Sequence, residues 1–244
     1  MQRYFAKDII DNIVQLDTKD IHHIKNVMRM KPNSIVEVVH NNNLYNAYIT
    51  SNYQVKITST IDNYQKTNKE IILSPALIKE QKQDLIFQKA TEIGVSKIIP
   101  LSLERCVVKI DKSKELKKKE RWNTICKEAS EQSKRLNIPT IENISTLEEL
   151  CNTKADLKII LNTKEDTKTL KNVLNNNPNC DKIIVVIGPE GGLTDKEVKY
   201  LEENGYISVT LGNNILRAET ACISVLSMIN YHFMRWDNGS NKQT

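Results

Sequence analysis

Glycine is scarce in this chain, at 7 of 244 residues, and aromatic side chains make up only 5%. The longest unbroken apolar run, residues 183–187, is far shorter than the roughly 20 residues that cross a bilayer. The first residues also lack the apolar core of a secretion signal. These absences exclude a collagen-like or membrane-spanning chain, and we expect a cytoplasmic protein with no membrane partner.

Cysteine occurs five times, an odd number, and no two cysteines form a C-x-x-C pair. A disulfide framework and a zinc ribbon are therefore both poor interpretations. We expect free thiols and no metal site. The five cysteines are Cys106, Cys126, Cys151, Cys180 and Cys222.

The overall composition, with 39% hydrophobic and 27% charged residues, is that of an ordinary globular protein. Its length allows one large domain or two modest ones. The net charge is only +5, but residues 109–135 hold ten Lys or Arg against five acids. Such a concentration of positive charge is typical of a protein that binds a nucleic-acid backbone. A solvated helix face would give the same pattern, so charge alone leaves both interpretations open.

Short strands around one helix are predicted for the first part of the chain. The strands, rich in β-branched and aromatic side chains, are residues 34–40, 44–50 and 55–61. Asparagines between the first two strands indicate a turn. Residues 17–30 have apolar side chains at helical spacing. We interpret residues 1–66 as a small β-rich domain and the polar residues 62–70 as a linker.

From residue 71 onward, apolar strands alternate with amphipathic helices, which is typical of an α/β domain with a mostly parallel sheet. The predicted strands are residues 71–73, 98–101, 157–161, 183–187 and 209–211. The predicted helices are residues 83–93, a long segment ending near residue 136, and residues 168–174, 195–204 and 218–234. Thr194 and Glu197 have the spacing of a capping box. We expect this second domain to cover residues 70–236.

Three of the seven glycines fall within residues 188–192, in the sequence IGPEGGL, and Gly212 follows the next predicted strand. Open α/β sheets bind ligands at the carboxyl ends of their strands, and glycine lets a ligand approach the backbone there. Two tight turns are the simpler alternative. Their pairing in a chain so poor in glycine favours a binding site.

These turns match neither common phosphate-binding motif, G-x-x-x-x-G-K-[ST] or G-x-G-x-x-G. Both turns also lie in the last quarter of the chain, whereas a dinucleotide-binding turn follows the first strand. Pro189 and Glu190 make the first turn stiff and negative. This chemistry suits a ligand with a positive centre, such as a sulfonium, better than a pyrophosphate.

Several ordered motifs resemble one family over nearly the whole chain. They are RYF at 3–5, HHIKNVMR at 22–29, QDLIFQKATEIGV at 83–95, ERCVVK at 104–109, EASEQSKR at 128–135, IGPEGGL at 187–193 and LGNNILRAETA at 211–221. Together they are similar to the small-subunit (16S) ribosomal RNA uracil-N3 methyltransferases of the SPOUT superfamily. The resemblance implies a PUA-like β-barrel domain, then an α/β methyltransferase domain with a parallel sheet and a carboxyl-terminal trefoil knot, in a homodimer.

The resemblance also implies that S-adenosylmethionine is the cofactor, bound in a cleft between three loops. The expected cofactor-binding residues are Leu161, Asn162, Thr163, Ile187, Gly188, Pro189, Glu190, Gly191, Gly192, Leu211, Gly212, Asn213, Ile215 and Leu216.

Methylation of uracil N3 needs a group that stabilises the developing uracil anion and a group that accepts the N3 proton. Arg217 is the candidate stabiliser, because a guanidinium stays charged, and for the same reason it cannot be the base. Glu190 and Glu219 are the candidate carboxylates. An ion pair or a helix cap is the alternative role for Glu219.

Ribosomal RNA or the small ribosomal subunit is the expected partner. The expected RNA-binding residues are Arg3, Arg29, Arg105, Lys109, Lys134 and Arg135. Two positions depart from the family, which often has Gly at the position of Lys134 and Arg at that of Asn214. The adjacent His22 and His23 lack a nearby partner at metal-ligand spacing, so RNA contact or helix packing suits them better than catalysis.

Three hypotheses from different classes remain at this point. An RNA methyltransferase explains the glycine-rich turns, the basic segment and the β-rich domain together. A nonenzymatic RNA-binding or ribosome-assembly factor leaves the turns without a role. An α/β enzyme that acts on a small nucleotide leaves the β-rich domain and the basic segment unexplained.

Overall fold

The computed structural model describes residues 1–61 and 69–233. The chain divides into two compact units, one of Met1–Asn68 with Asn123–Pro139 and one of Lys69–Trp122 with Thr140–Thr244. Most of the expected linker, and the end of the expected second domain, lie outside the described residues. Within the described part of the chain, no helix is long and apolar enough to cross a membrane.

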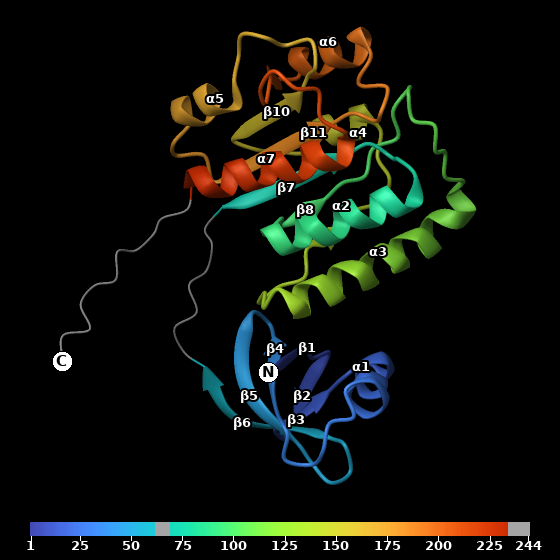
Figure 1. Ribbon diagram of the computed structural model, residues 1–244, viewed down its shortest axis with the longest axis vertical. Helices are drawn as coiled ribbons and strands as arrows, with labels where there is room; N and C mark the ends of the chain where they lie inside the picture. Colours follow the sequence, from blue (N-terminus) through green and yellow to red (C-terminus); the bar gives the residue numbers. More distant parts are fainter. Residues whose placement is uncertain (62–68, 234–244) are drawn as a thin grey trace, which may run out of the picture. The chain divides into compact units, whose positions relative to one another are not determined.

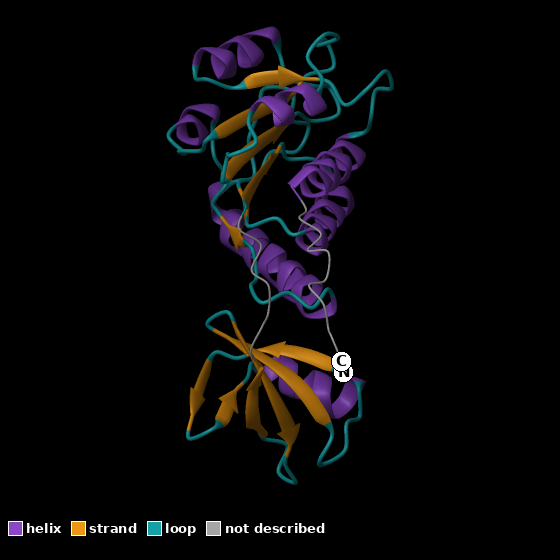
Figure 2. Ribbon diagram, turned by 90° about the vertical axis from the view of Figure 1, so that its left-hand side faces the viewer, coloured by secondary structure: helices purple, strands orange, loops and turns teal. Residues whose placement is uncertain are grey.

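The first unit is built on a curled six-stranded sheet with the strand order β1-β4-β5-β6-β3-β2 (Figure 2). Its strands are β1 (Gln2–Phe5), β2 (Asp8–Ile10), β3 (Ile13–Gln15), β4 (Ile35–His40), β5 (Asn43–Ile49) and β6 (Val55–Ile61). β1 runs parallel to β4 and the other pairs are antiparallel. The three strands predicted here are confirmed, and the fold is the expected PUA-like one.

Asparagine chemistry explains the turn between β4 and β5. His40 pairs with Asn43, so only Asn41 and Asn42 form the loop, and their φ angles are +49° and +60°. A two-residue hairpin loop of this kind needs positive φ at both positions, which asparagine tolerates better than most residues. The polar run therefore fixes the register of the hairpin.

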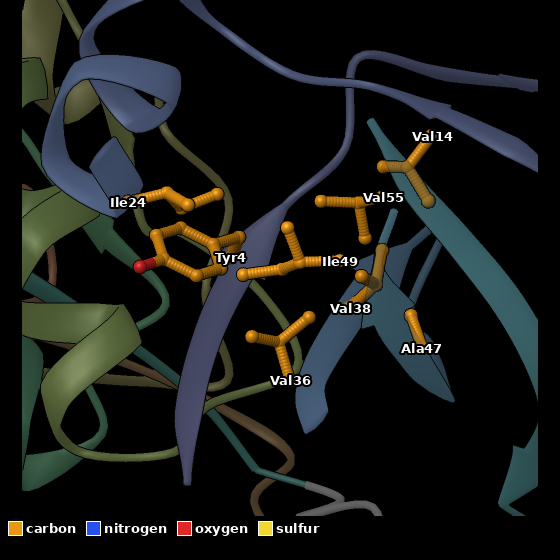
Figure 3. Close-up of a cluster of buried hydrophobic side chains, with 8 residues drawn as sticks. All are labelled: Tyr4, Val14, Ile24, Val36, Val38, Ala47, Ile49 and Val55. Carbon is orange, nitrogen blue, oxygen red and sulfur yellow. The ribbon is translucent and has the colours of Figure 1, made fainter. Parts of the chain in front are cut away.

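The core of the first unit is an apolar cluster between the sheet and one short helix, shown in Figure 3. Its buried members are Tyr4, Val14, Ile24, Val36, Val38, Ala47, Ile49 and Val55. The Tyr4 hydroxyl lies 3.0 Å from Nδ1 of His23, with which it shares a hydrogen bond. Burial raises the pKa of Tyr4 to about 12. His23 therefore contributes to helix packing, one of the two roles that its sequence context favoured.

The helix predicted over residues 17–30 is wrong in detail. The structure has a single turn of α-helix, α1 (Thr18–His22), followed directly by a π-helix, η1 (His23–Val27). The amide of Met28 donates to the carbonyl of His23, five residues back, which widens the turn. Arg29 then leaves the helix with a φ of +48°, and Pro32 prevents its continuation.

Residues 123–139 join the first unit through buried charges. Lys127 Nζ lies 2.6 Å from Asp20 Oδ1, 3.4 Å from Asp17 Oδ2 and 3.7 Å from Glu131 Oε1. Arg3 is buried, pairs with Glu37 at 2.9 Å, and donates to the carbonyl oxygens of Lys134 and Arg135. These contacts tie residues 127–135 to the sheet.

The second unit contains a six-stranded parallel sheet with the order β12-β10-β11-β7-β8-β9 (Figure 1). Its strands are β7 (Glu70–Pro75), β8 (Lys97–Ile98), β9 (Thr140–Ile141), β10 (Leu157–Leu161), β11 (Lys182–Ile187) and β12 (Ile207–Val209). β11 pairs with β10 on one side and β7 on the other, which explains why it is the most apolar strand. The expected parallel α/β domain is confirmed.

The helices are α2 (Glu80–Ile93), α3 (Lys112–Gln132), α4 (Leu147–Cys151), α5 (Leu170–Asn176), α6 (Asp195–Glu203) and α7 (Ala218–Phe233). The capping box of Thr194 and Glu197 is confirmed at the start of α6. The long helix ends at Gln132 and not near residue 136, because Lys134 adopts a left-handed φ of +62°. Glycine adopts that conformation most easily. β9 and α4 were not predicted.

The last helix, α7, packs against α2, β7 and β11 (Figure 1). Most of the apolar residues of α7 are buried. Those that are buried are Ala218, Ala221, Cys222, Val225, Leu226 and Ile229. Met228 differs, since 42% of it is exposed.

The environment of Glu131 generates a prediction for stability. Burial raises the pKa of Glu131 to about 7, so the folded chain binds this proton more tightly than the unfolded chain does. The free energy of unfolding should therefore fall between pH 4.5 and 7 as the buried carboxyl ionises, by about 3 kcal/mol. Glu131→Gln should remove this part of the pH dependence and stabilise the protein above pH 7, as measured by urea unfolding.

Glu128→Gln is the matched control, because Glu128 lies on the same helix but is exposed. It should leave the pH dependence of stability unchanged. Identical pH profiles for wild type and Glu131→Gln would contradict this account of the buried charges.

Candidate active site

The carboxyl ends of β10, β11 and β12 open into a cavity of about 680 Å³. Three loops surround it, at residues 162–166, 188–193 and 210–217. Every residue expected to bind the cofactor lines this cavity: Leu161, Asn162, Thr163, Ile187, Gly188, Pro189, Glu190, Gly191, Gly192, Leu211, Gly212, Asn213, Ile215 and Leu216. The first and third loops lie more than 40 residues apart in sequence, and the order of the parallel strands brings all three together.

The turn after β11 is built so closely that it has no room for a side chain at Gly188. A Cβ atom there would lie 2.9 Å from the backbone nitrogen of Leu193. Gly192 has a φ of +69° and donates from its amide to the carbonyl of Pro189 at 2.8 Å. Gly212, in the third loop, has a φ of +136°. These positions need glycine for the backbone itself.

A second segment holds the glycine-rich turn from outside. Nη1 of Arg105 donates to the carbonyl oxygen of Gly191 at 2.8 Å and to that of Leu193 at 3.3 Å. The amide of the preceding residue, Glu104, donates to Oε1 of Glu197 at 2.9 Å. Because Glu197 also caps α6, one carboxylate joins this segment to the helix that follows the turn.

Lys82, in the first turn of α2, lies at the edge of the cavity. Its Nζ is 3.3 Å from Oε1 of Glu190 and 3.7 Å from Oε1 of Glu219. Sequence reasoning missed Lys82, because a lysine near the start of an amphipathic helix carries no signal of its own. Its contacts depend on residues 108 and 137 positions away.

The three candidate catalytic residues are placed differently. Arg217 and Glu190 line the cavity. Glu219 is mostly buried, with 12% of its side chain exposed, and Lys82 separates it from Glu190. Among the described residues, no ion pair joins Arg217 to Glu219. Glu219 pairs with Lys82 instead, so the ion-pair role left open for it by the sequence has a partner in the structure.

Comparison with known proteins places this geometry in a family. Residues 65–230 match the RNA methyltransferase domain family, and residues 16–57 match the RNA methyltransferase PUA domain family. The ribosomal RNA small subunit methyltransferase E of Bacillus subtilis is 33% identical, over 95% of this chain and 96% of that protein. The methyltransferase E of Mesomycoplasma hyopneumoniae is 31% identical, over 93% and 98%.

The chain belongs to the ribosomal RNA small subunit methyltransferase E family. Solved structures agree with this. A putative methyltransferase from Legionella pneumophila with bound S-adenosylmethionine superposes with a TM-score of 0.86 at 30% identity, covering 95% of this chain and 97% of that one. A methyltransferase E from Neisseria gonorrhoeae bound to S-adenosylmethionine gives 0.85 at 27% identity, with the same coverage.

The residues expected to bind RNA differ in how exposed they are. Arg29, Arg105 and Lys109 are exposed. Lys134 and Arg135 are half-buried, and burial lowers the pKa of Arg135 to about 10. These five residues remain candidates for contact with RNA.

Arg3 is the exception and needs a correction. Only 4% of it is exposed, because its guanidinium lies against Glu37 and the carbonyls of Lys134 and Arg135. The structure therefore does not place the Arg3 side chain where RNA could reach it. Its position suits it to orienting Lys134 and Arg135.

The basic segment likewise contains two kinds of residue. Lys118 lies 2.7 Å from Glu80, Arg121 lies 2.6 Å from Asp84, and Lys127 belongs to the buried cluster described above. The positive charges of these three residues are paired with carboxylates of the same chain. Lys109, Lys112 and Lys117 are exposed. Charge counting alone could not separate the two kinds.

The cavity also has a polar loop that sequence reasoning missed. Lys164, Glu165 and Asp166 line it beside the expected residues 161–163. Hydrogen bonds from Thr167 and Lys168 lower the pKa of Glu165 to about 2 and fix the loop after β10.

The geometry of the glycines predicts how small substitutions should change the affinity for S-adenosylmethionine. Two of these similar structures contain that cofactor. Gly188→Ala places a Cβ against the Leu193 backbone, and Gly212→Val strains a left-handed position. Each should weaken cofactor binding at least 10-fold in calorimetry while the fold persists. Gly205→Ala is the control, since Gly205 has a φ of +83° but ends α6 away from the cavity. It should lower stability without changing cofactor affinity, and an unchanged affinity in Gly188→Ala would refute the assignment.

Proposed function

We propose that this chain transfers the methyl group of S-adenosylmethionine to N3 of a uridine in small-subunit ribosomal RNA. The observation that carries the proposal is the cavity at the carboxyl ends of three neighbouring parallel strands, lined by all the expected cofactor residues. Membership of the methyltransferase E family and the S-adenosylmethionine in two similar structures support the same reaction.

The cavity fits this cofactor in size and chemistry. Its volume lies within the roughly 300 to 1,000 Å³ usual for small-molecule sites. The loops of residues 187–192 and 211–216 present backbone groups that can hold an adenine edge. The Glu190 carboxylate provides negative charge suited to a sulfonium. When bound, the cofactor supplies an electrophilic methyl group.

The rest of the chemistry is the removal of the N3 proton and the stabilisation of negative charge on uracil. As the N3–C bond forms, the S–C bond breaks with its electron pair going to sulfur, and the N3 proton leaves. Arg217 lines the cavity from the third loop and can stabilise the charge that builds on the uracil oxygens. Glu190, in the second loop, lines the same cavity, and in this proposal its carboxylate accepts the proton. Glu219 lies behind Lys82 and supports this arrangement from the first turn of α7.

Arg217 should act on the chemical step. Arg217→Ala should lower the single-turnover methylation rate by about 10² to 10³ with little change in the cofactor dissociation constant. Arg217→Lys should restore only part of the rate, because an ammonium cannot reproduce a planar two-pronged contact. A large loss of cofactor affinity with an unchanged chemical step would assign Arg217 to cofactor binding instead.

RNA binding should depend on the exposed cations and not on the paired ones. Replacing Lys109, Lys112 and Lys117 together with glutamine should weaken RNA binding and flatten the slope of log affinity against log salt by about one for each phosphate that is no longer neutralised. A matched triple of exposed lysines, Lys171, Lys196 and Lys199 on α5 and α6, removes the same charge elsewhere. If both triples change the slope equally, only net charge matters.

The nonenzymatic alternative, an RNA-binding or assembly factor, gives the cavity no role. An enzyme acting on free nucleotides gives the PUA-like unit no role. Mass mapping of ribosomal RNA from cells that lack this protein separates these alternatives from our proposal. We expect one uridine to lose a methyl group, and unchanged small-subunit RNA would refute the proposed function.

We further propose a homodimer in the cytoplasm, where its ribosomal substrate is assembled. α7 supports the dimer, because it exposes Met228 and 80% of Tyr231 beside its buried face. Light scattering that gives the mass of a monomer would contradict it.

We also propose that the carboxyl-terminal segment forms the trefoil knot. In support, Thr210, just after β12, pairs with the segment that leads into α5: its amide donates to Lys168 O at 2.9 Å and its carbonyl accepts from Leu170 at 3.1 Å. The chain then continues into α7 against β7 and β11. A crystal structure that traces residues 162–217 without threading would contradict the knot.

A further inference from the structure

One ammonium group connects three segments around the cavity. Lys82 Nζ, from α2, lies 3.3 Å from Glu190 in the glycine-rich turn and 3.7 Å from Glu219 in the first turn of α7. These residues are far apart in sequence, so only the packing of α2 and α7 against the sheet brings them together. Both carboxylates lie within 4 Å of the same nitrogen.

Burial decreases along these three charged side chains toward the cavity. The side chain of Glu219 is 12% exposed, that of Lys82 is 32% exposed and that of Glu190 is 37% exposed. Lys82 and Glu190 line the cavity, whereas Glu219 is not among the described residues that line it. Glu219 therefore serves as a buried anchor for the ammonium, and the ammonium in turn faces Glu190.

The printed ion pair of this anchor involves only one of its two carboxylate oxygens, Oε1. Oε2 of Glu219 is buried and has no hydrogen-bond partner within the described part of the chain. A buried carboxylate oxygen without a donor is costly, so the attraction to Lys82 is the interaction that offsets the burial of this charge. The position of Lys82 beside Glu219 is therefore favoured over one in solvent.

We infer that Lys82 is a positioning residue of the methyltransferase, held by Glu219 and holding the Glu190 carboxylate at the cavity wall. The three groups together carry one net negative charge, with one cation between two carboxylates. That charge lies where the proposed reaction needs an acceptor for the N3 proton or a neighbour for a sulfonium. The inference rests on the proposed function, and it adds a residue that acts through Glu190.

Lys82→Met tests this role, because methionine keeps much of the aliphatic volume and removes the charge. We expect the single-turnover methylation rate to fall by about 10- to 100-fold, as is typical when a reacting group loses its position. Lys82→Arg should retain most of the rate, since a guanidinium can span both carboxylates. Glu219→Gln should reproduce part of the loss by weakening the anchor.

A double-mutant cycle shows whether Lys82 acts through Glu190. In the Glu190→Gln background, Lys82→Met should cause little further loss of rate. An equal loss in both backgrounds, or a loss of RNA affinity with a flatter salt slope in both, would overturn the inference and make Lys82 an independent contact.

Lys89→Met is the matched control. Lys89 lies on the same helix and pairs with Glu92 at 2.8 Å, but it does not line the cavity. The Lys89→Met variant should methylate RNA at the wild-type rate. If wild type itself does not methylate RNA, the proposed function fails; if wild type is active and Lys82→Met equals it, only this inference fails.

Discussion

The pairing of β11 between β10 and β7 is the constraint on which the rest of the second unit depends. Because β11 has neighbours on both edges and is buried along its length, its position and register are fixed. The chain must then leave the sheet at Ile187 and turn at once toward α6. Gly188 allows that turn because no side chain fits against the Leu193 backbone. The cavity exists because β10 and β12 end beside this turn.

Contacts from outside the sheet keep the turn in one shape. Arg105 donates to two of its carbonyl oxygens, and Lys82 pairs with the Glu190 side chain. Glu197 accepts from the Glu104 amide and so connects the segment that carries Arg105 to α6. None of these contacts uses the backbone atoms of the strands. Neighbouring segments therefore hold this loop in shape through two backbone carbonyls and one side chain. A pre-organised site of this kind limits the cost of binding.

Much of this could be predicted from the sequence, because the relevant signals are local. The apolar run of β11, the glycines after it and the capping box of Thr194 and Glu197 each lie within a few residues, and each appears in the structure. The paired asparagines that close β4 and β5 are of the same kind.

What could not be predicted depends on contacts between distant residues. Lys82 and Glu219 meet across 137 positions, and the burial of Arg3 depends on backbone carbonyls more than 130 residues away. Arg3 looked like an RNA contact because its charge is visible in the sequence and its partners are not. The π-helix of residues 23–27 is a local departure from the predicted helix, and its buried residue Ile24 packs in the same core cluster as Tyr4.

The most direct test is methyl transfer by the purified full-length chain, with deuterium-labelled S-adenosylmethionine and small ribosomal subunits that lack this modification. Mass spectrometry of the digested RNA locates the label. The account predicts that a single uridine gains one labelled methyl group on its base, at N3, and that free uridine nucleotides gain none. Label on a ribose, on another base, or on no nucleotide would contradict it.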